Sequence, residues 1–187
     1  RRTHASLVKS LCAAGPVAIG LDIAFSEPGD DEMADAALAN AVAECGRVVL
    51  PMVIETAHTG GQVLESPPIR PLAIAAAGLG RVGVRLDEDG IARSVDLREG
   101  VGSASWPLFP EALLRVGGML EPPAVAGEKP EVDQSLVRQD TRRLQFVGPP
   151  GAIPRVSYDL VLQGQAPPGF FAGKTVFVGA TAVGLGD

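Results

Sequence analysis

Aromatic and clustered basic residues are scarce in this sequence, and each shortage excludes something. Phe, Tyr and Trp make up 4% of the 187 residues, so the core has to be built from Val, Leu, Ile and Ala. The net charge is −6, and adjacent basic residues occur only at Arg1-Arg2 and Arg142-Arg143. Because proteins bind the nucleic-acid backbone through clustered Lys and Arg, we expect no nucleic-acid partner.

Long apolar runs are lacking as well. No stretch approaches the roughly 20 apolar residues that span a bilayer, and the first residues do not resemble a signal peptide. Taken alone, this pattern indicates a cytoplasmic protein. The chain nevertheless opens without Met and inside an apparent helix, so we expect a fragment of a longer protein. Its composition, 46% hydrophobic and 20% charged, is typical of a globular chain, and we expect residues 1–187 to form a single domain.

Groups suited to catalysis are few. The only histidines are His4, in a terminal helix, and His58, in a loop. Neither lies at a strand end, where the active sites of α/β proteins are found. Cys12 and Cys45 have apolar neighbours, which is typical of packed thiols rather than of nucleophiles. We therefore expect no catalytic residues and no cofactor.

The first half of the chain predicts a strand, a helix and a second strand. A helix is expected over residues 3–14, and residues 17–25, "VAIGLDIAF", are almost all apolar, as in a strand covered on both faces. A second helix begins at an N-cap, Asp30 or Asp31, and ends at Gly46. The strand "RVVLPMVI" follows. This order predicts a right-handed parallel crossover.

Both cysteines precede a glycine that ends a helix, and both helices lead into parallel strands. Cys12 and Cys45 should therefore lie near the amino edge of the sheet. A disulfide needs Cα atoms within about 7 Å of each other. Because the two helices could cover opposite faces of the sheet, two separate thiols are preferred to a bridge.

The second half predicts antiparallel additions. Residues 56–68 are expected to form a surface loop, and Pro71 begins a short helix. Alternating side chains around "DEDG" predict a hairpin, and "SLVRQ" with "RLQFVG" predicts another. A helix over 110–116, a Gly/Pro-rich linker, a helix over 158–162 and a strand over 175–178 follow. The fold class is α/β, with a mixed, largely parallel sheet flanked by helices and antiparallel hairpin additions.

Two patterns resemble binding sites but favour simpler interpretations. The ending "GATAVGLGD" lacks the Lys and Ser/Thr of a phosphate loop, so it favours a strand that leaves the sheet. The acidic run from Glu27 to Asp35 lacks the Asp-x-Asp-x-Asp-Gly pattern of a calcium loop. Acids at a helix start are favoured by its free N–H groups. We expect no metal site.

Asp22 and Arg93 are polar residues in distinctive surroundings. An unpaired carboxylate inside an apolar strand is costly, so Asp22 must be paired, hydrogen-bonded or at an exposed strand end. It either fixes the loop "SEPGD" or stands at the lip of a ligand crevice, since ligands of open α/β sheets bind outside the carboxyl ends of strands. Arg93 follows the "DEDG" turn, where an ion pair with Asp87 is preferred to ligand binding.

Five segments, in their order and spacing, resemble the type-2 CHASE domain, the extracytoplasmic sensory module of bacterial cyclases and kinases. They are "HASLVKSLCAAGPVAIGLDIAFSEP", "DDEMADAALANAVAECGRVVLP", "LGRVGVRLDEDGIARSVDL", "IPRVSYDLVLQG" and "FFAGKTVFVGATAVGLGD". The most specific elements are Gly20-x-Asp22-x-x-Phe25, Asp87-x-Asp89-Gly90-x-x-Arg93, and Gly179-Ala180-Thr181-Ala182 with Asp187. The resemblance covers nearly the whole chain.

The resemblance implies a place and a role. In that family a membrane helix precedes the domain, further membrane helices follow it and a cytoplasmic output domain comes last, which places the domain in the periplasm. The implied partners are the flanking transmembrane helices and a cyclase or kinase output domain of the same chain. The resemblance does not supply the ligand; an unknown small molecule and a second copy of the chain are further candidate partners. The domain itself is expected to be non-catalytic. The rival hypotheses are a small-molecule or nucleotide-binding α/β enzyme and a dimerisation scaffold without ligand.

The candidate ligand-binding residues are Asp22, Phe25, Ser26, Arg93 and Thr181. The two ends of the chain should lie close to this group. The first helix runs back along the first strand, so its start lies at the carboxyl edge of the sheet. The final strand, if parallel, ends at the same edge, and we therefore expect both chain ends to emerge there.

Overall fold

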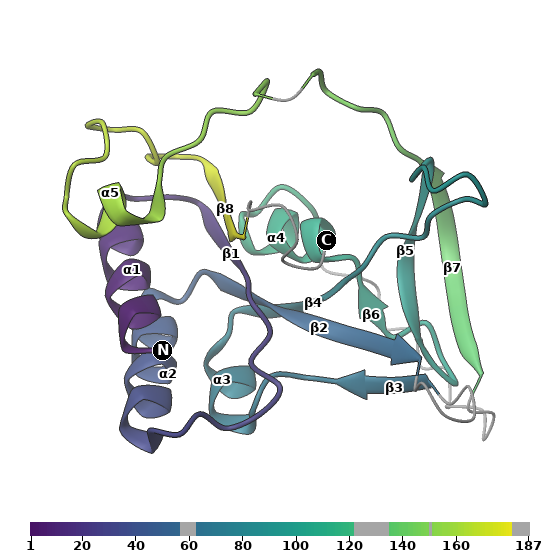
Figure 1. The fold of residues 1–187 in the computed structure, drawn as a ribbon, viewed down its shortest axis with the longest axis horizontal. Helices are drawn as coiled ribbons and strands as arrows, with labels where there is room; N and C mark the ends of the chain where they lie inside the picture. Colours follow the sequence, from purple (N-terminus) through teal and green to yellow (C-terminus); the bar gives the residue numbers. More distant parts are fainter. Residues whose placement is uncertain (57–62, 122–134, 150, 181–187) are drawn as a thin grey trace.

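Two sheets and five helices make up the fold in the computed structural model, which describes residues 1–56, 63–121, 135–149 and 151–180 (Figure 1). The first sheet contains β1 (Ala18–Asp22), β2 (Val48–Thr56), β3 (Val63–Ser66), β4 (Gly78–Val82) and β8 (Thr175–Gly179). The second contains β5 (Ser94–Val101), β6 (Trp106–Pro107) and β7 (Leu136–Arg143). The helices are α1 (Arg2–Ala13), α2 (Glu32–Cys45), α3 (Arg70–Ala75), α4 (Phe109–Val116) and α5 (Tyr158–Leu162). None of the helices in these described ranges is long and apolar enough to cross a bilayer.

The first sheet is mixed and largely parallel. β1 pairs in parallel with β2 on one side and with β8 on the other. β4 is parallel to β2, and β3 runs antiparallel to the carboxyl half of β2. The α/β fold class expected from the sequence is therefore confirmed, including the parallel placement of the final strand.

Helices cover both faces of this sheet. The apolar residues of α1 and α2 pack with Ile19, Leu21 and Leu50 in the larger core cluster. On the opposite face α4 packs through Phe109 and Leu113. Asp31 caps α2 by accepting from the N–H groups of residues 33 and 34, and Gly46 ends it in the left-handed conformation, as the sequence indicated.

Two glycines allow α4 to lie close to the sheet. A Cβ at Gly20 would stand 2.7 Å from Leu113 Cδ1, and one at Gly80 would stand 2.6 Å from the backbone Cα of Phe109. A side-chain carbon can move aside, whereas the backbone of α4 cannot move without repacking the helix. Gly20, the first residue of the Gly-x-Asp-x-x-Phe pattern, thus has a packing role.

Replacing Gly80 with alanine is expected to lower the free energy of unfolding by about 2 kcal/mol, because the new methyl group overpacks the contact with α4. Gly78 lies on the same strand and is the matched control, since a Cβ there would meet its nearest neighbour, Val116 Cγ2, at 3.4 Å. Urea unfolding of Gly80→Ala and Gly78→Ala compares the two. Equal midpoints for both variants would contradict a close approach at Gly80.

Both predicted hairpins are wrong. β4 pairs with β2 in the first sheet, whereas β5 pairs with β6 and β7 in the second, so the strands on either side of "DEDG" do not pair with each other. Only the turn itself is present, closed by the Asp87 N–H to the Ile91 carbonyl at 3.0 Å. The segments of the other expected hairpin contribute one strand, β7, antiparallel to β5. Alternation shows that a segment is extended but does not show which strand it joins.

The expected surface loop over 56–68 is also partly wrong, because Val63–Ser66 form β3. Residues 57–62 lie outside the described residues, as does most of the Gly/Pro-rich linker. The helices expected after residue 100 are confirmed, as α4 and α5.

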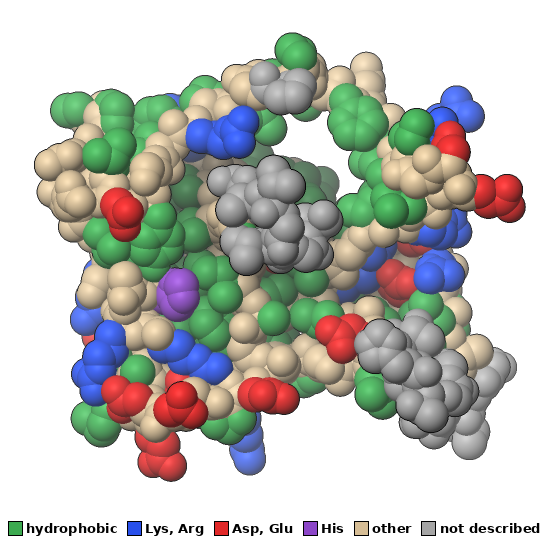
Figure 2. Space-filling view, in the orientation of Figure 1, with side chains coloured by type: hydrophobic (Ala, Val, Ile, Leu, Met, Phe, Trp, Pro, Cys, Tyr) green, Lys and Arg blue, Asp and Glu red, His purple; other side chains and the backbone are tan. Residues whose placement is uncertain are grey.

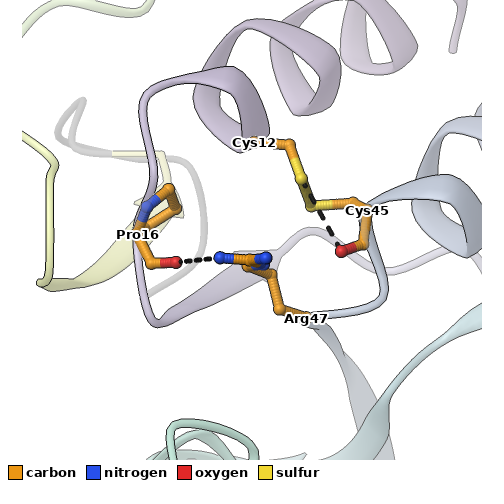
Figure 3. Close-up of a disulfide and its surroundings, with 4 residues drawn as sticks. All are labelled: Cys12, Pro16, Cys45 and Arg47. Carbon is orange, nitrogen blue, oxygen red and sulfur yellow. Dashed lines mark hydrogen bonds between the residues drawn. A yellow bond between two sulfur atoms is a disulfide. The ribbon is translucent and has the colours of Figure 1, made fainter.

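Cys12 and Cys45 form a disulfide, so the prediction of two separate thiols is wrong (Figure 3). Their Cα atoms are 5.7 Å apart. The bridge is formed because α1 and α2 lie side by side on the same face of the sheet, instead of on opposite faces. Next to it, the Arg47 guanidinium donates to the Pro16 carbonyl at 2.7 Å, which joins the segments that lead into β1 and β2.

Candidate functional site

Three of the predicted site residues lie together at the carboxyl end of β1. Asp22 is the last residue of that strand, paired opposite Gly179 of β8, and it is exposed. It therefore ends the apolar strand and does not interrupt it. Phe25 is buried and Ser26 is exposed in the loop that follows. Thr181 lies outside the described residues.

Arg93 is not part of this group. It lies in the connection between β4 and β5, toward the second sheet (Figure 1). Its guanidinium pairs with Asp87 at 2.8 Å and with Asp89 at 2.7 Å. The ion pair preferred for Arg93 is therefore present, and it folds the exposed turn.

The start of α1 lies at the same edge as Asp22. Arg1 pairs with Asp35 of α2, donates to the Glu27 carbonyl and stands 5.3 Å from the centre of the Phe25 ring. A hydrogen bond from the Gly29 N–H, together with the Arg1 guanidinium, lowers the pKa of Asp35. The start of the first helix and the end of β8 thus both border the carboxyl end of β1, whereas the chain end itself, residues 181–187, lies outside the described residues.

His4 lies one turn further along α1. Its Nδ1 is 2.8 Å from the Tyr158 hydroxyl, and its ring packs edge-on against Phe25. Figure 2 shows a histidine side chain (purple) above the basic and acidic side chains at this corner of the molecule. Burial lowers the pKa of His4 below its usual 6.5, and the positive charge of Arg1 adds to the effect. Neutral imidazole is therefore the form that the folded chain favours.

The stability of the fold is expected to fall as the pH drops below about 6.5, because the unfolded chain then binds a proton at His4 more readily than the folded chain does. Thermal unfolding between about pH 7.5 and about pH 5 measures this, above the range in which carboxylates titrate. His4→Gln is the comparison, and His58 is present in both proteins, so its contribution cancels. Parallel pH profiles for the two proteins would show that His4 contributes nothing.

A second group of polar residues, which the sequence did not predict, lies where the two sheets meet. β4 contacts β6, and β3 contacts β5. A cavity of about 180 Å³ opens there, bordered by charged side chains of β4, β5 and β7 and of the segment after β4. The charged lining residues are Arg81, Arg85, Asp96, Glu99 and Arg138.

Three of these charged residues are almost fully buried: Arg81 is 4% exposed, Asp96 3% and Glu99 7%. Arg81 Nε lies 2.8 Å from Glu99, and the same guanidinium donates to the carbonyls of Gly83 and Asp96. Arg138 Nε lies 2.8 Å from the other Glu99 oxygen. Burial lowers the pKa of Arg81, while the charges of Glu99 and Asp96 oppose this shift. The network joins a strand of the first sheet to two strands of the second.

Both acids border the cavity although their spacing along β5 does not predict it. Asp96 and Glu99 are three residues apart, a spacing that places side chains on opposite faces of a regular strand. Between these two acids the pairing of β5 with β7 is interrupted, at Leu97 and Asp140. Asp140 has a φ of 58°, and no other described residue except glycine has a positive φ. Asp tolerates this conformation better than most residues do.

The sequence carried a weak signal for this network. Arg81 stands in "GLGRVG", where a cation among apolar and glycine residues is as unusual as Asp22 in its strand. Because the segment was interpreted as half of a hairpin, Arg81 was not named as a candidate residue. Its burial follows from the pairing of β4 with β2, which local alternation does not predict.

The described residues contain no group of three or more His, Cys, Asp or Glu side chains that could hold a metal ion. The acids near the cavity are bound to arginines, and Asp31 and Asp35 are bound to Arg2 and Arg1. The chemistry available at both places is recognition by charge and hydrogen bonds.

Comparison with known proteins agrees with the architecture. The family model described as "CHASE2 domain" matches residues 1–187, the whole chain. The chain belongs to the CHASE2 domain family. Comparisons with curated proteins and with solved structures found no match.

CHASE2 is a family of extracellular sensory domains, and the family resemblance stated from the sequence is therefore confirmed. A sensory role for this CHASE2 domain agrees with its two polar regions, which offer charged and hydrogen-bonding groups for recognition. One lies at the edge shared by the start of α1 and the end of β8. The other lies at the junction of the sheets.

Proposed function

We propose that this CHASE2 domain is the extracytoplasmic sensor of a bacterial membrane-bound signalling protein. It binds a small molecule on the periplasmic side and passes its state through flanking transmembrane helices to a cytoplasmic cyclase or kinase output domain of the same chain. The observation that carries the proposal is the shared edge: Arg1, the N-cap of α1, contacts the β1–α2 loop, and Gly179 of β8 is paired with Asp22, the last residue before this loop.

This arrangement suits a domain held between two membrane helices. Segments that leave a domain at one edge can enter the same membrane side by side. A change at that edge then moves both connections together, so a ligand that favours one conformation shifts the population seen by the output domain. The Cys12–Cys45 disulfide supports the location, because structural disulfides persist in oxidising compartments such as the periplasm.

The location is tested in the full-length protein in bacterial cells. An epitope tag is inserted between Glu88 and Asp89, in the exposed turn of the β4–β5 connection, where insertions are tolerated. We expect antibody to bind this tag after the outer membrane alone is opened. The matched control carries the tag at the carboxyl terminus of the full-length protein, which should react only after the inner membrane is permeabilised. A tag in the turn that reacts only after permeabilisation would refute the extracytoplasmic location.

A further inference from the structure

We infer that the cavity at the junction of the two sheets is the binding site for a small monocarboxylate, with Arg85 and Arg138 as the groups that hold the carboxylate. The inference rests on the proposed sensory function and adds to it the place and chemical class of the ligand. It rests on the charges, the walls and the size of the cavity.

The charge balance of the cavity favours an anion. Three arginines and two acids line it. Glu99 is bound by Arg81 and Arg138, and Asp96 accepts from the Thr141 hydroxyl and lies 3.7 Å from Arg138. The acids are therefore already neutralised, and a cationic ligand would have to displace an arginine. One positive charge is left over.

That excess charge lies where a ligand can reach it. Arg85 is exposed, and its guanidinium donates a long hydrogen bond, of 3.3 Å, to the Ser94 hydroxyl. Arg138 is 41% exposed, whereas Arg81 is held inside by Glu99 and two carbonyls. Guanidinium groups bind carboxylates through paired N–H donors that match the two oxygens. Arg85 and Arg138 are thus the arginines that can recognise a ligand.

The rest of the lining favours a short apolar chain. Besides the charged groups, the cavity is bordered by Ile54, Val82, Val84 and Val95. Its volume of about 180 Å³ is below the roughly 300–1,000 Å³ of pockets that enclose drug-sized ligands. A dianionic phosphate carries one negative charge more than the single excess positive charge can balance, and it would leave the valine walls uncovered. A carboxylate with a few carbon atoms satisfies both parts of the cavity.

Binding of the carboxylate would also alter the ion pairs between the two sheets. A carboxylate on Arg138 competes with Glu99 for the same guanidinium, and Glu99 in turn holds Arg81 of β4. The ligand therefore changes the ion pairs that connect the two sheets. This gives the cavity a physical route to the parallel sheet, whose strands β1 and β8 end at the edge shared with the start of α1.

Calorimetric titration of the 187-residue chain with butyrate, butyramide, L-valine and inorganic phosphate tests the site. We expect butyrate or L-valine to bind and butyramide, which has the shape of butyrate without its charge, to bind at least about tenfold more weakly. L-valine distinguishes an amino acid from a simple carboxylic acid as the source of the carboxylate. Failure of both carboxylates to bind, equal binding of butyramide, or preferred binding of phosphate would overturn the inference.

The Arg85→Gln variant locates the site. Because Arg85 is exposed and outside the buried network, its loss should leave the fold intact, and we expect the Kd of the bound carboxylate to rise about tenfold. Arg155→Gln, which removes an exposed arginine that does not line the cavity, is the matched control and should leave Kd unchanged. An equal effect of the two variants would show that the carboxylate binds elsewhere. These measurements use binding alone, so their failure leaves the extracytoplasmic location to be judged by the epitope experiment.

Discussion

Reduction of the Cys12–Cys45 disulfide is expected to lower the free energy of unfolding by about 3–4 kcal/mol. The two cysteines are 33 residues apart in sequence, and a bridge across a loop of this length removes many conformations from the unfolded chain. The bridge also holds α1 against α2 at the amino edge of the first sheet. Urea unfolding with and without a reductant measures the difference.

The double variant Cys12→Ser/Cys45→Ser is the control. It should unfold at the same urea concentration as the reduced wild-type chain and should not respond to the reductant. A thiol titration of the unfolded, unreduced wild-type chain should find no free thiol. Two free thiols per chain, or a wild-type midpoint that the reductant leaves unchanged, would contradict the bridge.

The sequence predicted the correct edge of the sheet for both cysteines. It did not predict that α1 and α2 lie on the same face of that sheet. A right-handed crossover fixes the side on which α2 lies, because α2 connects two parallel strands, β1 and β2. The rule applies to a helix that connects two parallel strands, and no connection of this kind places α1 among the described residues. The proximity of Cys12 to Cys45 therefore depends on packing between α1 and α2, which periodicity within either helix does not reveal.

The elements that the sequence predicted correctly differ from the others in whether their signal is local or depends on contacts between elements. The strands β1, β2 and β8 and the helices α1, α2, α4 and α5 each carry their signal within their own residues, as apolar runs, helical spacing or caps. β4 and β7 were recognised as extended, but their partners were not. The partner of β4 is β2, which is separated from it by β3 and α3, and no local turn specifies that pairing.

The two candidate sites differ in the same way: one follows from a local pattern, and the other depends on which strands pair. Asp22, Phe25 and Ser26 were chosen as candidates because they lie at or just after the end of an apolar strand that the sequence identifies. The Arg81 network was missed because its members come from three strands whose pairing was predicted incorrectly. Asp96 and Glu99 both border the cavity although they are three residues apart on one strand, and regular alternation of side chains does not predict this.

Arg81→Met is expected to lower the free energy of unfolding by about 3–5 kcal/mol. The variant leaves the buried Glu99 without one of its two arginines. Met fills much of the volume of the arginine side chain, so the loss measures charge and hydrogen bonding more than packing. Urea unfolding of the variant against the wild-type chain gives the value. Arg93→Gln is the control. It breaks an arginine–carboxylate pair of similar geometry in an exposed turn, and it should change the midpoint little, because solvent replaces the lost interactions.

A third protein separates the two reasons why Arg81→Met could be costly. In Arg81→Met/Glu99→Leu both the buried cation and the carboxylate that it binds are absent, so no charge from this pair is left uncompensated. Replacing both partners of a buried ion pair with apolar groups is often neutral or even stabilising, whereas removing one is not. We therefore expect the double variant to recover most of the stability lost in the single variant. If it is as unstable as Arg81→Met, the loss comes from the bonds of Arg81 to the Gly83 and Asp96 carbonyls, and those bonds, not the charges, hold the two sheets together.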